Sequence, residues 1–119
     1  MKLVVCLRAS DQPIAECKKI SMEFLVHMEV ARIEGGEERE KQLREQEAAR
    51  TRQLAKQGML SRLWRVPGRR ENWGIWRADD CDQLHDALVS LPLFAYLTIT
   101  VHPLASHPND PGIPHSPQG

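Results

Sequence analysis

Arg62 to Arg77 reads RLWRVPGRRENWGIWR, and it holds all three tryptophans of the chain together with five arginines. Two apolar runs in it flank the turn signal Pro67-Gly68. This pattern predicts two strands joined as a hairpin, RLWRV and NWGIWRA. The segments on either side of the hairpin then decide the fold.

Upstream of the hairpin, the sequence predicts one strand and one long helix. In Met22–Val30, MEFLVHMEV, apolar residues alternate with others, so Phe24, Val26 and Met28 share one face of a half-buried strand. The charged stretch Glu37–Gln57 consists of strong helix formers and is followed by Gly58, a typical helix end.

Downstream, the pattern repeats as a shorter helix and a last strand. Asp80 with Gln83 three residues later resembles a capping box that starts the helix CDQLHDALVSL, which ends before Pro92. AYLTITVHPL alternates again. The order β-α-β-β-α-β predicts an α+β fold of the ferredoxin-like type, a four-stranded antiparallel sheet with both helices on one face. We expect another subunit to cover the other face, making the protein a homo-oligomer.

Composition narrows the class of protein. The chain has 119 residues, enough for one domain, and its 16 basic and 16 acidic residues cancel. A neutral total counts against nucleic acid as a partner. The three cysteines have no metal-ligand or redox spacing, which predicts a reduced, cytoplasmic protein without a metal site. The apolar run LVVCL near the start is too short to cross a membrane, so we expect no membrane partner.

Three regions are expected along the chain. Residues 1–21 differ in pattern from the rest of the chain and are interpreted as an N-terminal extension, either native or the product of a misplaced start. Residues 22–105 form the domain. Residues 106–119 are a Pro-rich tail.

Several segments together resemble the muconolactone delta-isomerase family over about residues 22 to 110. They are MEFLVHMEV, GMLSRLWRV, ENWGIW and CDQLHDALVSLPLFAYLTITVHPLASHP, in which LPLF-x-Y followed by V-x-PLA-x-HP is the most specific part. The resemblance implies a cofactor-independent isomerase of the β-ketoadipate route of aromatic breakdown. It would convert muconolactone, a small anionic lactone, to 3-oxoadipate enol-lactone, and it would assemble as a decamer. Ala95 and a short loop at Gly35-Gly36 depart from the family pattern, so a paralogue acting on a substituted lactone stays open.

Such a reaction needs a base, a donor for the enolate oxygen and a cation for the substrate carboxylate. Glu47 is the candidate base, because helical phase puts it on the face shared by Leu43 and Leu54. A family glutamate at this position favours the same choice. The alternative is a solvated glutamate paired with Arg44 or Arg50, which lie three residues to either side.

Other candidate site residues are taken from the strands. Arg65, expected in a central strand on the same face as Leu63, would bind the substrate carboxylate or form an interface ion pair, and Arg44 and Arg50 could share the first role. His27 is a second acid or base candidate, or else an interface or core histidine. Asn72 could donate to the enolate or simply occupy a turn. Trp64 and Tyr96 would line the substrate pocket or fill the core.

Two further functions are compatible with these residues. Tryptophans and arginines together could bind single-stranded nucleic acid, although the neutral total charge disfavours it. A non-catalytic ferredoxin-like module that binds a small acid is the other, and full exposure of Glu47 would favour it.

Overall fold

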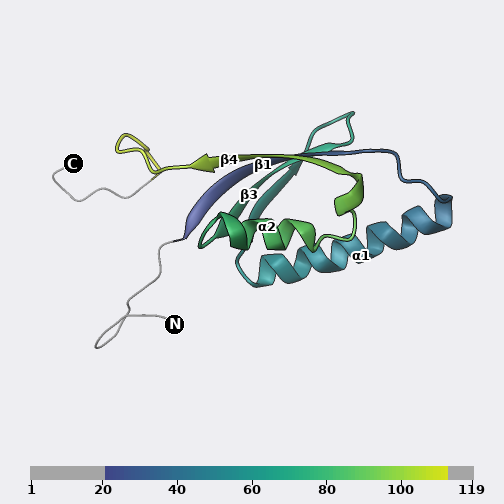
Figure 1. Cartoon of the computed structure of the whole chain (residues 1–119). Coiled ribbons are helices and arrows are strands. Elements are labelled where there is room, and N and C mark those ends of the chain that lie inside the picture. Colours follow the sequence, from purple (N-terminus) through teal and green to yellow (C-terminus); the bar gives the residue numbers. More distant parts are fainter. Residues whose placement is uncertain (1–20, 113–119) are drawn as a thin grey trace, which may run out of the picture.

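The computed structural model describes residues 21–112. Six main elements occur in the predicted order (Figure 1): β1 (Met22–Val30), α1 (Glu37–Lys56), β2 (Leu60–Arg65), β3 (Glu71–Ala78), α2 (Cys81–Val89) and β4 (Leu97–Leu104). The predicted βαββαβ fold class is confirmed. The expected N-terminal extension lies, apart from Ser21, outside the described residues, as do residues 113–119 of the expected tail.

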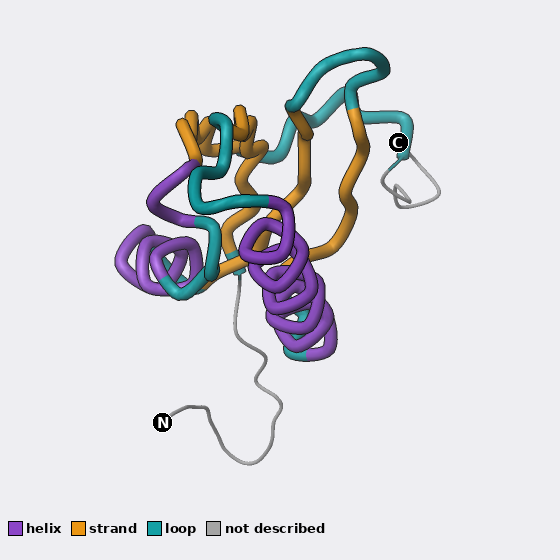
Figure 2. The backbone as a smooth tube through the Cα atoms, turned by 90° about the vertical axis from the view of Figure 1, so that its right-hand side faces the viewer, coloured by secondary structure: helices purple, strands orange, loops and turns teal. Residues whose placement is uncertain are grey.

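The sheet has the strand order β2-β3-β1-β4, and every neighbouring pair is antiparallel. Both helices lie on the same side of it (Figure 2). Because β3 inserts between β1 and β2, β2 is an edge strand. The expectation that Arg65 sits in a central strand was therefore wrong, and Arg65 is exposed at the edge of the sheet.

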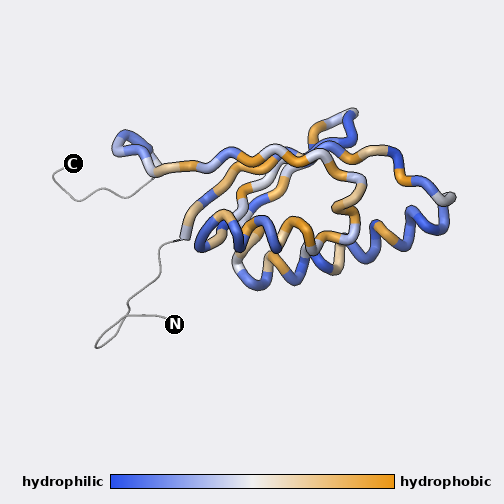
Figure 3. Tube along the Cα trace, viewed as in Figure 1, coloured by the Kyte–Doolittle hydropathy of each residue, from blue (hydrophilic) through white to orange (hydrophobic). Residues whose placement is uncertain are grey.

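The core fills the space between the sheet and the helices. Phe24 and Val26 of β1 and Leu54 of α1 are fully buried there, as the alternation and the helical phase predict. Most of α1 is hydrophilic along its length, with isolated apolar residues, whereas apolar segments follow the strands and α2 (Figure 3). The long helix therefore has only a narrow contact with the sheet, so few of its residues face inward.

The helix ends are formed by local hydrogen bonds that the sequence predicts. Gly58 has a φ of 83°, and the N–H groups of Gly58 and Met59 donate to Ala55 and Leu54, which closes the end of α1. At the start of α2, the Asp80 side chain accepts a hydrogen bond from the Gln83 N–H at 2.8 Å. These bonds close the C-terminal end of α1 and the N-terminal end of α2.

The start of the last strand differs from the prediction, and α2 ends two residues earlier than expected. Phe94–Tyr96 form a 3-10 turn, and β4 begins only at Leu97. The turn is closed by the Tyr96 N–H, which donates to the Leu93 carbonyl at 2.7 Å. Within residues 21–112, none of the helices is long and apolar enough to cross a membrane.

Candidate active site

Glu47 lies on the face of α1 that is turned toward the sheet, and its side chain is half-buried. Its Oε1 accepts a hydrogen bond from the backbone N–H of Leu93 at 3.0 Å. Leu93 follows Pro92 in the link between α2 and β4, so this segment holds the carboxylate in place. Burial raises the pKa of Glu47, and this outweighs the opposite effects of the Leu93 N–H and the Arg44 charge.

A small inner cavity of about 30 Å³ lies beside Glu47, between α1 and the sheet. Its lining consists of Met28, Glu47, Thr51, Leu60, Leu63, Asn72, Trp76 and Leu91. Two buried polar atoms of this lining, Asn72 Oδ1 and Trp76 Nε1, have no hydrogen-bond partner among the described residues. The lining of the inner cavity is thus mostly apolar, and its polar side chains are those of Glu47, Thr51, Asn72 and Trp76.

A larger outer pocket of about 620 Å³ adjoins the inner cavity, since Leu63 and Asn72 line both. Four arginines line it: Arg44, Arg65, Arg69 and Arg70. Three of them have partners, which are the Glu40 carboxylate, the Glu71 carboxylate and the carbonyls of Val30 and Ala31. Within the described part of the chain, the Arg65 guanidinium has no hydrogen-bond or ion-pair partner, which leaves it available to an anionic ligand.

The structure brings several predicted site residues together and separates others. Glu47, Arg44, Arg65, Asn72 and Trp64 line the two adjoining pockets. Arg50 lies elsewhere on α1 and donates to Ser90 Oγ at 2.9 Å. Tyr96 accepts a hydrogen bond from Arg39 at 2.7 Å and lines neither pocket. Asn72 belongs to β3 and does not occupy a turn.

His27 is on the opposite face of the sheet from Glu47. Its neighbours Val26 and Met28 are buried under the helices, so the alternation of β1 turns His27 outward. There its ring packs against Trp73, with 4.4 Å between centroids. The sheet therefore separates His27 from Glu47 and the inner cavity, while its partner Glu71 lines the outer pocket.

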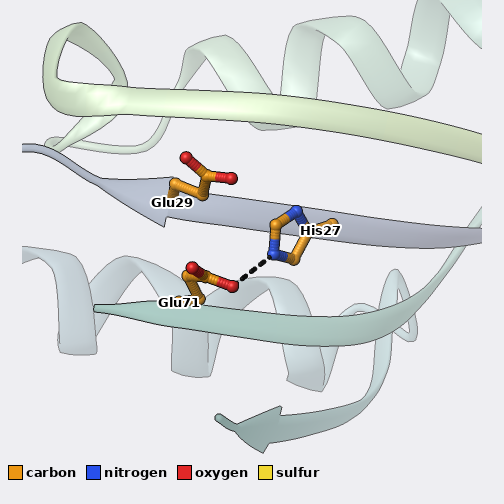
Figure 4. Close-up of side chains that lie close together, drawn as sticks. All are labelled: His27, Glu29 and Glu71. Atoms are coloured by element: carbon orange, nitrogen blue, oxygen red, sulfur yellow. Dashed lines mark hydrogen bonds and ion pairs between the residues drawn. The ribbon is translucent and has the colours of Figure 1, made fainter. Parts of the chain in front are cut away.

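His27, Glu29 and Glu71 gather on this outer face (Figure 4), and their possible metal-ligand atoms lie within 4.8 Å of one another. Glu71 already accepts hydrogen bonds from Arg69 at 2.6 Å and pairs with His27 at 3.0 Å. These bonds, that of Arg69 first, lower the pKa of Glu71. Since Arg69 already neutralises the carboxylate, a cation would have to compete with it.

Comparison with known proteins adds to this geometry. The family described as Muconolactone delta-isomerase matches residues 22–110. The chain belongs to this family. A muconolactone delta-isomerase of Cupriavidus pinatubonensis is 40% identical over 67 residues, which cover 56% of this chain and 73% of that protein. One of Rhodococcus opacus is 36% identical over 64 residues, covering 54% and 69%.

A solved crystal structure of muconolactone isomerase has the same architecture. It superposes with a TM-score of 0.71 at 29% identity, covering 80% of this chain and all of that one. As a member of the muconolactone delta-isomerase family, the chain is an isomerase. Its matched region, 22–110, contains both pockets.

Sequence reasoning missed two features of this candidate site. Leu93, whose N–H holds Glu47, is 46 residues away in the chain, and its role depends on a backbone atom that no residue pattern reveals. Trp76 is not among the site residues predicted from the sequence. Strand alternation does put Trp76 on the face of Asn72, and a buried indole N–H normally needs a partner, so that signal is present in the sequence.

Proposed function

We propose that this isomerase moves the ring double bond of muconolactone to give 3-oxoadipate enol-lactone, with Glu47 as the base that shuttles the proton. The observation that carries the proposal is the half-buried carboxylate of Glu47, whose pKa is raised. It lines the small inner cavity, which adjoins the arginine-lined outer pocket. The match of residues 22–110 to the muconolactone delta-isomerase family supports the choice of substrate.

The proton transfer proceeds in two steps. The Glu47 carboxylate takes the proton from the ring carbon that bears the acetate side chain. The electron pair of that C–H bond forms the new ring double bond, the old double bond shifts toward the lactone carbonyl, and the carbonyl oxygen becomes an enolate. Protonated Glu47 then returns the proton to the carbon next to the carbonyl. A raised pKa suits both steps, because the group must accept and release a proton near neutral pH.

Arg65 binds the acetate side chain in this proposal. Its guanidinium is exposed in the outer pocket, on the same side of the sheet as Glu47, and a free guanidinium can bind a carboxylate with two parallel hydrogen bonds. Arg44 contributes positive charge nearby, although it is also paired with Glu40. A substituted muconolactone would meet the same groups and is the alternative substrate.

A non-catalytic module that binds a small acid is the weaker candidate. It would have been favoured by a fully exposed Glu47, but the side chain is half-buried and hydrogen-bonded. A binding module would also have no need of a carboxylate with a raised pKa, which repels an anionic ligand whenever it is ionised.

Self-association belongs to the proposed function as well. The face of the sheet away from the helices bears Leu25, Trp73 and Ile75, all half-buried in a single chain, and Trp64 is 44% exposed beside them. We propose that a second copy of the chain covers this face; the family resemblance suggests a decamer. Sedimentation velocity at micromolar concentration should detect an oligomer, and a single species of one chain's mass would contradict it.

The exposed free thiol of Cys81 suits a reducing, cytoplasmic setting.

The activity itself is tested by incubating the protein with muconolactone and following the ultraviolet absorbance of the conjugated lactone. We expect the absorbance to fall, and product analysis by nuclear magnetic resonance to show the enol-lactone. No turnover of muconolactone or of its substituted forms, at enzyme concentrations comparable to the substrate, would reject the proposed function.

A further inference from the structure

Trp76 carries a hydrogen-bond donor that the fold leaves unused. The side chain is 2% exposed, and its Nε1 is buried without a partner among the described residues. An indole N–H can only donate, so no reorientation turns it into an acceptor. Leaving such a donor unpaired in the interior costs free energy, and persistent cases call for an explanation such as a ligand.

Trp76, which bears this unpaired donor, lines the inner cavity together with Glu47. At about 30 Å³ the inner cavity has room for one water-sized group, such as a single oxygen atom, but not for a lactone ring. Gly74 keeps the space beside the indole open, because a Cβ there would lie 3.2 Å from Trp76 Nε1 and 3.0 Å from the Arg62 carbonyl oxygen. The ring of a substrate would stay in the outer pocket with one atom inserted.

We propose that Trp76 Nε1–H is the donor that binds the lactone carbonyl oxygen and stabilises the negative charge that develops on it as the enolate forms. This rests on the proposed function, since it assigns the oxygen-binding part of that reaction. The inserted oxygen would lie in the same cavity as the Glu47 carboxylate, which would bring the ring carbons within reach of the base. Trp76 would then be a catalytic residue, because it touches the reacting atoms.

Asn72, the donor predicted from the sequence, is less suited to this task as it stands. Its buried unpaired atom is the carbonyl oxygen Oδ1, which accepts hydrogen bonds and would repel an enolate. Asn72 could donate only if its amide turned around. The indole N–H of Trp76 donates without any such turn, and a preorganised donor is what stabilises a developing oxyanion most effectively.

Two variants test the contribution of the Trp76 N–H apart from that of its aromatic ring. Trp76→Phe removes the N–H and keeps an aromatic ring under the helices. Trp73→Phe is the matched control, because Trp73 lies on the same strand but faces the other side of the sheet. Loss of one oxyanion donor typically lowers kcat by about 10²–10³-fold. We expect a loss in that range for Trp76→Phe with KM changed by less than about threefold, and little change for Trp73→Phe.

Nuclear magnetic resonance of the indole N–H groups supplies a second measurement, made on the full-length protein with isotope-labelled tryptophan. The three resonances are assigned with the Phe variants, and the probe is the saturated lactone that carries the same acetate side chain. We expect the Trp76 resonance to move downfield on binding. If Trp76→Phe does not fold, this shift decides the matter.

The outcomes distinguish the two proposals. Normal kcat in Trp76→Phe, or a Trp76 resonance that stays fixed when the probe is bound, overturns the role of Trp76 while leaving Glu47 in place. Normal turnover in Glu47→Gln overturns the proposed mechanism instead. A structural role for Trp76 would lower the unfolding temperature without lowering kcat, and that result also counts against the inference.

Discussion

Two glutamates, one on each side of the sheet, have pKa values that are shifted in opposite directions. Glu47 lies under the sheet on the helix side, where burial raises its pKa and a backbone N–H donates to it. Glu71 lies on the other face, where Arg69 and His27 hydrogen-bond to it and lower its pKa. One carboxylate is prepared to exchange a proton, and the other is held as an anion.

This difference shows how the fold assigns roles to like residues. Both glutamates belong to regular elements, and each lies within a few residues of arginines. What separates them is the set of donors that reach the carboxylate, which are the Arg69 and His27 side chains at Glu71 and one backbone N–H at Glu47. Environments that push the pKa values of similar groups apart are a known sign of an acid or base assignment. We therefore expect substitutions on the helix side to affect chemistry and those on the outer face to affect it little.

The largest effect is expected for Glu47→Gln. The amide keeps the shape and can still accept the Leu93 hydrogen bond, but it cannot take the proton. Turnover of muconolactone should fall by about 10²–10⁴-fold, the usual contribution of a general base. Glu45→Gln, on the exposed side of the same helix, is the control and should keep its activity. Near-normal turnover in Glu47→Gln would remove this residue from the mechanism.

A smaller effect on binding is expected for Arg65→Lys. The change keeps the charge but loses the planar fork that binds a carboxylate with two hydrogen bonds. KM should rise about tenfold with kcat nearly unchanged, because the acetate side chain does not react. Arg62→Lys is a matched control on the same strand, since Arg62 stacks over Trp64 and lies outside both pockets. Equal KM values for the two variants would argue against Arg65 as the carboxylate ligand.

A still smaller effect on turnover is expected for His27→Gln. The sheet separates His27 from Glu47, so kcat/KM should change by less than about threefold in steady-state assays. If the outer face is a subunit contact, the sedimentation profile is where a change should be detected. A loss of kcat comparable to that of Glu47→Gln, with the oligomer intact, would contradict the expectation that substitutions on the outer face have little effect on the chemistry.

The last and smallest effect concerns stability. A carboxyl group whose pKa is raised by folding binds its proton more tightly in the folded state. The free energy of unfolding therefore decreases as the pH rises from the unfolded pKa through the folded one. Glu47→Gln removes this penalty, so thermal unfolding at pH 7 should occur at a slightly higher temperature than in the wild type, while at low pH the two should converge. A lower unfolding temperature at pH 7 would show that the ionised carboxylate is stabilising.

Much of this arrangement can be predicted from the sequence because it depends on local periodicity. The alternation of Met22–Val30 identifies the buried face of β1, and the helical phase of Leu54 identifies the inward position of Glu47. The hairpin and both helix ends depend on turn and cap residues. The same local reasoning places Arg65 and Asn72 in strands, on the side that proves to face α1.

The rest depends on contacts between distant parts of the chain. Edge or central position is set by strand order, so the exposure of Arg65 could not be predicted from its apolar neighbours. The hydrogen bond from Leu93 to Glu47 needs the link after α2 to pass over the middle of α1. The unpaired N–H of Trp76 results from packing around it. Residue type and spacing do not determine any of these.

The most direct test compares two titrations. Carboxyl resonances of glutamate-labelled protein, with Glu47 assigned by its absence in Glu47→Gln, give the pKa of this group, and the pH dependence of kcat/KM gives the pKa of the essential base in the free enzyme. We predict that Glu47 titrates above the ordinary glutamate value of about 4.3 and that kcat/KM rises with pH through the same midpoint. A Glu47 pKa at or below the ordinary value, or a rise in kcat/KM that does not follow it, would contradict the assignment of Glu47 as the base.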